Sequence, residues 1–253
     1  PSILKSAKAK WWITDASGRV LKSGRLKTQR IGNYGVFPLG TFQYMLNSVT
    51  APQKLTIHLS VGDKVHNSWD IWVYPHHKDL MQTTPDVLYT TTYDAKAKQY
   101  LQEGKKVVLC PKPNKVKGRK SVFHNHFWNP IMFKWAPTTL GCLIHADQPM
   151  FADFITEKHL DWQWWDILTN AQELRPFIQV IDSYETNQKL GIGFEARVNN
   201  GKLLVLAVDT RKDLDKRPAT QQLLKSIDQY VKSGQFAPRA TVKEEFIQSF
   251  LIK

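Results

Sequence analysis

Residues 86–110 read DVLYTTTYDAKAKQYLQEGKKVVLC, and this stretch decides the fold of the larger part of the chain. Its two apolar runs, 86–90 and 106–110, have the length of strands, and the second is apolar at nearly every position, as a strand buried on both faces should be. Between them, Asp94 can cap a helix over 95–103, and Gly104 can end that helix in the left-handed conformation. A strand, a helix and a second strand in this order predict a β-α-β unit.

The residues that follow continue this alternation of strands and helices. Residues 177–181 repeat the buried-strand pattern, and residues 191–198 and 202–208 flank Asn199-Asn200-Gly201, which favours a hairpin. Pro218 can open a helix, and Thr241 with Glu244 forms a capping box for a last helix. The helix after Pro218 has one apolar stripe, made by Leu223, Leu224, Ile227, Tyr230 and Val231. We therefore expect an α/β domain with a largely parallel sheet covered by helices.

The first part of the chain shows strand patterns only. Residues 10–13 and 19–22 surround a turn cluster, which predicts a hairpin, and residues 54–61 alternate so that every second side chain shares one apolar face. Residues 69–74 form a further strand, which Pro75 stops. Short strands in this number predict an all-β sandwich for residues 1–77. The polar, aperiodic stretch that begins at residue 76 marks a boundary, so we expect the α/β domain at residues 78–253.

Composition excludes several classes of protein. Of the 253 residues 42% are hydrophobic, so the chain is globular rather than disordered. The net charge of +13 is scattered and no nucleic-acid-binding motif appears, so we expect neither a nucleic-acid partner nor a cofactor. No apolar run approaches the ~20 residues of a membrane span, and the 2 cysteines cannot build a disulfide framework. Because the chain begins at Pro1 without a leader-like segment, we expect a processed protein or an excised piece.

Several motifs, read in order, resemble a known family. They are NSWDIWVYP at 67–75, LGCLIH at 140–145, HLDWQWWD at 159–166, QVID at 179–182 and GKLLV at 201–205. This set is similar to the C-terminal region of bacterial family 2 glycoside hydrolases, the β-galactosidase-like group. The resemblance covers nearly the whole chain. It implies an immunoglobulin-like sandwich followed by a flavodoxin-like domain similar to class I glutamine amidotransferases.

The resemblance implies an accessory region rather than the catalytic domain. Family 2 enzymes retain configuration through two carboxylates on a (β/α)₈ barrel, and a barrel needs about 250 residues of its own. The family's acid/base glutamate follows an asparagine, and this chain contains no Asn-Glu dipeptide. We therefore expect the barrel upstream in the same polypeptide, as the partner, and export to the periplasm or secretion. Packing on that barrel predicts an exposed apolar surface on the sandwich, near Trp11, Trp12 or Phe37.

A thiol nucleophile is the feature that amidotransferase chemistry would require. Such enzymes place a cysteine on a tight elbow, with a His-x-Glu pair later in the chain. Cys110 follows a strand, but Pro111 after it has no N–H to donate, and the chain contains no His-x-Glu. We interpret Cys110 and Cys142 as packing residues. A stand-alone hydrolase acting through Cys110 remains as an alternative.

The densest aromatic cluster suggests a carbohydrate site. On a helix, Trp162 and Trp165 share one face while Trp164 lies on another. Indoles stack on sugar faces, and Trp128, His159 and Asp161 are further candidates for the site. The competing interpretation is that the three tryptophans wedge the helix against the sheet. If the site exists, the chain is a carbohydrate-binding module in its own right.

A basic run and two histidines complete the candidate residues. The run carries five cations and no acid after a predicted strand, where open α/β sheets bind ligands: Lys112, Lys115, Lys117, Arg119 and Lys120. It is either an anion site or a mobile loop in solvent. His124 and His126 could offer two imidazoles to a metal, but zinc needs three or four ligands, so we expect no metal.

Overall fold

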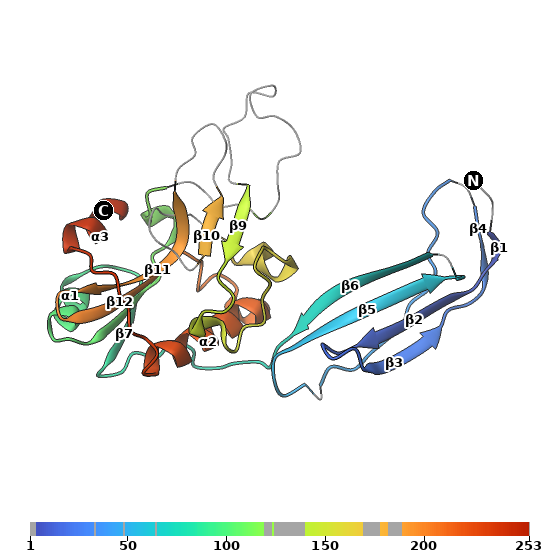
Figure 1. Ribbon diagram of the computed structural model, residues 1–253, viewed down its shortest axis with the longest axis horizontal. Helices are drawn as coiled ribbons and strands as arrows, with labels where there is room; N and C mark the ends of the chain where they lie inside the picture. Colours follow the sequence, from blue (N-terminus) through green and yellow to red (C-terminus); the bar gives the residue numbers. More distant parts are fainter. Residues whose placement is uncertain are drawn as a thin grey trace, which may run out of the picture. The chain divides into compact units, whose positions relative to one another are not determined.

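The computed structural model describes residues 4–32, 34–47, 49–63, 65–118, 123, 140–168, 178–181 and 189–252. The chain divides into two compact units, Pro1–Pro75 and His76–Lys253 (Figure 1). The sequence placed this boundary at residues 77 and 78.

The first unit is built on one antiparallel sheet. Its strands are β1 (Leu4–Ala7), β2 (Ala9–Thr14), β3 (Val20–Arg25), β4 (Gln29–Ile31), β5 (Gln53–Val61) and β6 (Val65–Val73). Four of them pair in the order β3-β2-β5-β6, and β1 pairs with β4. The β1–β4 pair continues the β2–β3 hairpin, because the Leu26 N–H donates a hydrogen bond to the Ala9 carbonyl at the point where the two pairs of strands meet.

One face of this sheet carries a small core. Trp11, Ile13 and Leu55 are buried there, as the alternating pattern of β5 predicted for Leu55. The Trp11 indole stacks on Phe42, from the long connection between β4 and β5, at a centroid distance of 4.0 Å. A Cβ at Gly24 would come within 2.8 Å of this indole, so the glycine lets Trp11 lie across β3.

The β-rich character of the first unit is confirmed, but its layering differs from the predicted sandwich. Among the described residues 4–75, no second sheet faces the four-stranded one; a connecting segment supplies the aromatic cover instead. The physical reason is register: β1 and β4 extend an existing hairpin end to end, so they add length and not a layer.

The second unit is α/β, with one six-stranded mixed sheet. In spatial order the strands are β7 (Val87–Thr90), β8 (Lys106–Leu109), β12 (Gly201–Leu206), β11 (Leu190–Val198), β10 (Ile178–Ile181) and β9 (Gly141–Ile144). The first three are parallel, as the β-α-β prediction required, and every later pairing is antiparallel. The expectation of a largely parallel sheet is therefore wrong for the β11–β9 half, where the strands are antiparallel neighbours.

Three α-helices cover the two faces of this sheet. They are α1 (Ala95–Gln102), α2 (Pro218–Lys232) and α3 (Glu244–Phe250). Helices α1 and α3 share one core with Val107, Leu203 and Val205. Successive strand residues point to opposite faces of the sheet, so the others face α2. Tyr89 on β7 is an example, because its hydroxyl donates to Asp228 of α2. The described residues of the unit also form four short 3₁₀ helices: η1 (Pro113–Lys115), η2 (Pro149–Phe151), η3 (Trp162–Asp166) and η4 (Leu214–Lys216).

Most local signals act as predicted. Asp94 accepts a hydrogen bond from the Ala97 N–H at 3.0 Å, and Gly104 has a φ of 77° at the end of α1. Asn199, with a φ of 52°, turns the chain between β11 and β12. The predicted capping box is wrong: α3 begins after Lys243, because Thr241 pairs with the edge of β11 at Arg197 instead.

Candidate functional site

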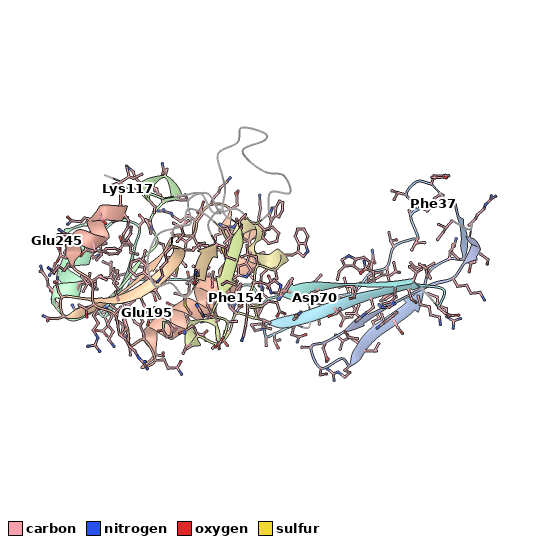
Figure 2. The ribbon with its side chains drawn as sticks, turned by 45° about the horizontal axis from the view of Figure 1, so that its top comes forward. Phe37, Asp70, Lys117, Phe154, Glu195 and Glu245 are labelled. Atoms are coloured by element: carbon pink, nitrogen blue, oxygen red, sulfur yellow. The ribbon has the colours of Figure 1, made fainter. Side chains whose placement is uncertain are left out.

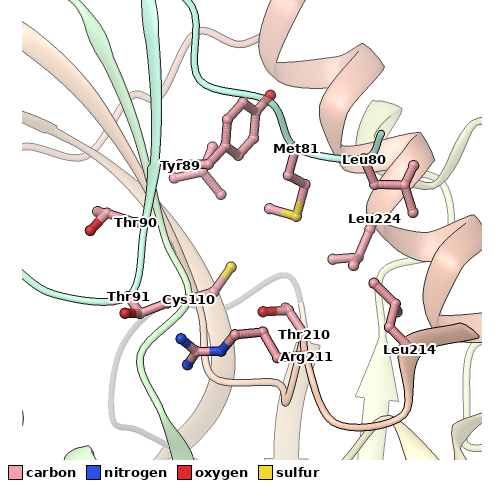
Figure 3. A pocket seen from close by; sticks show the side chains of 11 residues that line it. Leu80, Met81, Tyr89, Thr90, Thr91, Cys110, Thr210, Arg211, Leu214 and Leu224 are labelled. Atoms are coloured by element: carbon pink, nitrogen blue, oxygen red, sulfur yellow. The ribbon is translucent and has the colours of Figure 1, made fainter. Parts of the chain in front are cut away.

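A cavity of about 190 Å³ lies at the carboxyl ends of the parallel strands, on the face that α2 covers (Figure 3). Residues at the ends of β7, β8 and β12 meet there with the segment before β7, η4 and α2. The lining residues are Leu80, Met81, Tyr89, Thr90, Thr91, Val108, Cys110, Thr210, Arg211, Leu214 and Leu224. Open α/β sheets bind ligands at this edge, which makes the cavity a candidate site.

The interior of the cavity is mainly apolar, and two of its polar lining residues, Tyr89 and Thr90, already have hydrogen-bond partners. The Tyr89 hydroxyl donates to Asp228 at 2.5 Å, and burial together with this bond raises the pKa of Tyr89. The Thr90 hydroxyl donates to the Thr92 carbonyl at 3.0 Å. Figure 3 shows the sulfur atoms of Cys110 and Met81 directed into the space between the lining side chains.

A tightly bonded loop carries Arg211 to the edge of this cavity. The Asp209 carboxylate accepts from the Arg211 and Lys212 N–H groups, both at 3.0 Å. The buried Arg217 donates to the carbonyls of Asp209 at 2.8 Å and Lys212 at 3.1 Å. Burial would raise the pKa of Asp209, but these N–H groups and the neighbouring arginines lower it, so the carboxylate stays charged.

The Cys110 thiol has none of the features of a nucleophile. It is buried, and burial raises its pKa to about 12, against which the charge of Arg211 acts only weakly. A reactive thiol needs a lowered pKa, so the alternative of a Cys110-dependent hydrolase finds no support in this geometry. Cys142 on β9 is also buried, in keeping with a packing role.

The tryptophan cluster divides between the two interpretations that the sequence left open. Trp164 is fully buried, and its indole N–H donates to the Thr156 hydroxyl at 2.9 Å. Trp162 and Trp165 are 69% and 61% exposed on the other side of η3, with centroids 6.1 Å apart and planes inclined by 30°. Phe123 contacts both rings, at centroid distances of 5.3 Å and 5.4 Å. We call Trp162 and Trp165 the aromatic pair.

A polar network holds the aromatic pair in place. Asp161 caps η3 by accepting from the Gln163 N–H at 3.2 Å, and the Gln163 amide donates to the Ile155 carbonyl at 2.7 Å. Burial raises the pKa of Asp161, although its hydrogen bonds oppose the shift. Asp161 therefore caps η3 and holds the Gln163 side chain in place. His159 is exposed and bridges to Leu143, and Trp128 lies outside the described residues.

The basic run is partly built into the fold. The N–H of Lys117 donates to the Phe250 carbonyl at 2.7 Å, and the N–H of Ile252 donates to the Lys115 carbonyl at 2.9 Å. The backbone at 115–117 is thus paired with the segment after α3, which corrects the interpretation of a mobile loop for this stretch. Of its cations, Lys115 lines a second cavity, of about 490 Å³, while Arg119 and Lys120 lie outside the described residues.

The first unit exposes a run of apolar side chains, which we call the apolar segment, residues 34–46. Val36 is 98% exposed, Tyr34 87% and Met45 71%; Phe37, Phe42 and Leu46 are also exposed (Figure 2 labels Phe37). Trp11 is buried and Trp12 half-buried, so the apolar side chains exposed in this region belong to the segment that contains Phe37, and Phe42 of this segment stacks on Trp11.

Sequence reasoning missed the cavity beside Cys110 and its cation, Arg211. The signal was available: Thr210-Arg211 follows the apolar run 202–208, and residues just after a parallel strand lie at the ligand-binding edge. Among the described residues, no three His, Cys, Asp or Glu side chains gather as metal ligands. None of the helices described here is both long and apolar enough to cross a bilayer.

Two families match the chain. The family described as a domain of unknown function (DUF8487) matches residues 88–252, and the domain of unknown function DUF8488 matches residues 1–75. The two matches fall on the two structural units. No curated protein matches the chain.

Proposed function

The chain belongs to the family described as a domain of unknown function (DUF8487), and from its own residues we propose that it is a non-catalytic accessory region of a carbohydrate-degrading enzyme of the family 2 β-glycosidase type. Its task would be to pack on the upstream catalytic barrel of the same polypeptide. Export to the periplasm or secretion belongs to the same proposal.

The observation that carries this proposal is the apolar segment 34–46. Tyr34, Val36 and Met45 expose most of their side chains, although Phe42 in the same segment stacks on Trp11. The unit's own core therefore anchors the segment through Phe42 and Tyr44, and it leaves Tyr34, Val36 and Met45 in solvent. Large exposed apolar side chains gathered in one short segment are typical of a protein–protein contact in soluble proteins.

The resemblance supplies the partner, and the chemistry of the described residues is in keeping with an accessory role. The thiol that stands nearest to an amidotransferase nucleophile, Cys110, is neutral at physiological pH because burial raises its pKa to about 12. Two polar groups that line the same cavity, Tyr89 and Thr90, already make hydrogen bonds within the fold.

The test compares the isolated chain with the complete polypeptide that contains it. The stretch before Pro1 should encode a (β/α)₈ barrel, and amide hydrogen exchange within residues 34–46 should slow by at least tenfold in the complete polypeptide, because docking buries them. The double variant Val36→Ser, Met45→Ser should bind the separately expressed barrel more weakly. Val20→Ser is the matched control, because Val20 is 54% exposed outside the segment. Equal exchange in both contexts, or unchanged binding by the double variant, would refute docking through this segment.

A second function, carbohydrate binding, is favoured by the aromatic pair. Two indoles held at 6.1 Å by a buried network offer a preorganised stacking surface. Titration with β-galactosides, uronic acids and pectic oligosaccharides should quench tryptophan fluorescence. Trp162→Ala and Trp165→Ala should each weaken binding about tenfold, equivalent to about 1.4 kcal/mol. Trp69→Ala removes an indole that is 48% exposed in the first unit and should change nothing. No heat and no quenching at millimolar ligand would exclude this function.

A further inference from the structure

The cavity beside Cys110 has the size of a small ligand. Its volume is about 190 Å³. An engineered apolar cavity of about 150 Å³ binds benzene. A body of roughly the size of one aromatic ring, or of a short branched alkyl chain, therefore fits the space.

The walls favour an apolar body. Leu80, Met81, Leu214 and Leu224 contribute hydrocarbon and a thioether, and Tyr89 contributes its ring because its hydroxyl is bonded to Asp228. The Cys110 thiol adds no negative charge at neutral pH, since burial raises its pKa. None of the side chains that line the wall therefore carries a negative charge that would repel an anionic ligand.

The edge of the cavity favours an anionic head. Arg211 lines it and makes no ion pair among the residues described, and its exposed side chain can still reach solvent. Its backbone is held by Asp209, whose carboxylate oxygen accepts the Arg211 N–H rather than the guanidinium. Thr91 and Thr210 add hydroxyl groups to the same lining. A guanidinium with adjacent hydroxyls matches the planar, two-oxygen geometry of a carboxylate.

The segment that closes the cavity is held in an unfavourable backbone conformation. Asp79 and Met81 have φ values of 53° and 56°, in the left-handed region that side chains other than glycine rarely adopt. These two residues bracket Leu80, so the conformation turns both Leu80 and Met81 toward the cavity (Figure 3). Such strain concentrates at ligand-binding sites.

We propose that this cavity binds a small monocarboxylate with an apolar body, its carboxylate on Arg211 and its body against Met81, Tyr89 and Leu224. The site is in the second unit and does not depend on the docking proposed for residues 34–46. The ligand class is that of benzoate, phenylacetate or isovalerate. Longer or doubly charged acids exceed the space or lack a second cation in the lining.

The test is calorimetric titration of the whole chain with benzoate, phenylacetate and isovalerate, against benzamide as the neutral match and sulfate as a plain anion. We expect a Kd of about 1 mM or tighter for a carboxylate, as is ordinary for fragments of this size. Arg211→Gln should weaken that binding at least tenfold and leave benzamide unaffected. Lys216→Gln, an exposed cation of the same loop that does not line the cavity, should have no effect.

A second readout places the ligand inside the cavity. Because Met81 and Leu224 line it, bound benzoate or phenylacetate should shift the methyl NMR resonances of these two side chains, whereas sulfate should not. Binding that Arg211→Gln leaves unchanged, binding without a shift of the Met81 and Leu224 methyl resonances, or no heat from any carboxylate at 10 mM would each overturn the proposal.

Discussion

Replacing the buried Gly201 by alanine should destabilise the second unit. Gly201 is the first residue of β12 and follows the Asn199-Asn200 turn. A Cβ there would lie 2.6 Å from the Lys105 carbonyl oxygen and 2.7 Å from the Leu101 Cα, both backbone atoms. No side-chain rotation relieves these contacts, so the end of α1 and the start of β12 must separate.

The expected cost follows from what that separation breaks. Overpacking against a rigid neighbour costs about 1–3 kcal/mol. Moving the Lys105 carbonyl also disturbs its hydrogen bond from the Lys202 N–H, at 3.1 Å, which contributes about 1 kcal/mol. The sum is about 2–4 kcal/mol, equivalent to a fall in Tm of roughly 4–16 °C for a domain of this size.

Differential scanning calorimetry of wild type and Gly201→Ala measures this directly, with Gly234→Ala as the matched control. A Cβ at Gly234 meets nothing within 4 Å, so this variant should be neutral or stabilised by about 0.4–1 kcal/mol through a less flexible unfolded state. Equal Tm values for Gly201→Ala and wild type, or an equal loss in both variants, would refute the reasoning.

Three further predictions concern single side chains of the second unit. Tyr89→Phe should lower the unfolding free energy by about 1–3 kcal/mol in denaturant titrations, because one carboxylate oxygen of the buried Asp228 loses its donor while Lys232 still bonds the other; an unchanged midpoint would contradict this. Asp94→Ala should cost about 1 kcal/mol through loss of the cap. Hydrogen bonding, first of all from the Ala97 N–H, lowers the pKa of Asp94 below 3.8, so the cap stabilises above that pH and is lost as pH falls through the lowered value; the variant should lack this acid-side decline. Burial raises the pKa of Cys110 from 9.0 to about 12, so the unfolded thiol ionises first and stability should fall between these pH values, a decline that Cys110→Ala should remove.

The parts of the fold that the sequence predicts are those with local causes. Asp94 and Gly104 bound α1 through hydrogen bonds and backbone conformation that involve only near neighbours. The turn at Asn199 pairs β11 with β12 for the same reason. By contrast, β10 pairs with β9 across the long stretch of residues 145–177, and no local pattern distinguishes antiparallel from parallel partners there.

The candidate site divides in the same way. The helical spacing of the tryptophans separates Trp162 and Trp165 from Trp164, and the structure has this separation. Which side is buried depends on Thr156 and Ile155, and nothing in the spacing reveals those contacts. Arg211 reaches the cavity of Cys110 only because β12 lies beside β8 in the sheet, a pairing that the sequence alone does not specify.

Two of the chain's cations bind carbonyl groups at or just beyond the carboxyl end of α2, so their presence does not require an acidic partner. Lys106 and Lys202 are direct neighbours on β8 and β12, an arrangement that like charges disfavour. Lys106 donates to the Val231 carbonyl at 2.6 Å, in the last turn of α2, and Lys202 to the Phe236 carbonyl just beyond it at 2.8 Å. The carbonyl end of a helix carries partial negative charge, which offsets the repulsion between the two ammonium groups. Burial, and then the charge of Lys202, lower the pKa of Lys106. Lys106→Met should therefore leave the Val231 carbonyl without this donor, although the variant also removes the repulsion between Lys106 and Lys202. We infer that the two cations serve the fold.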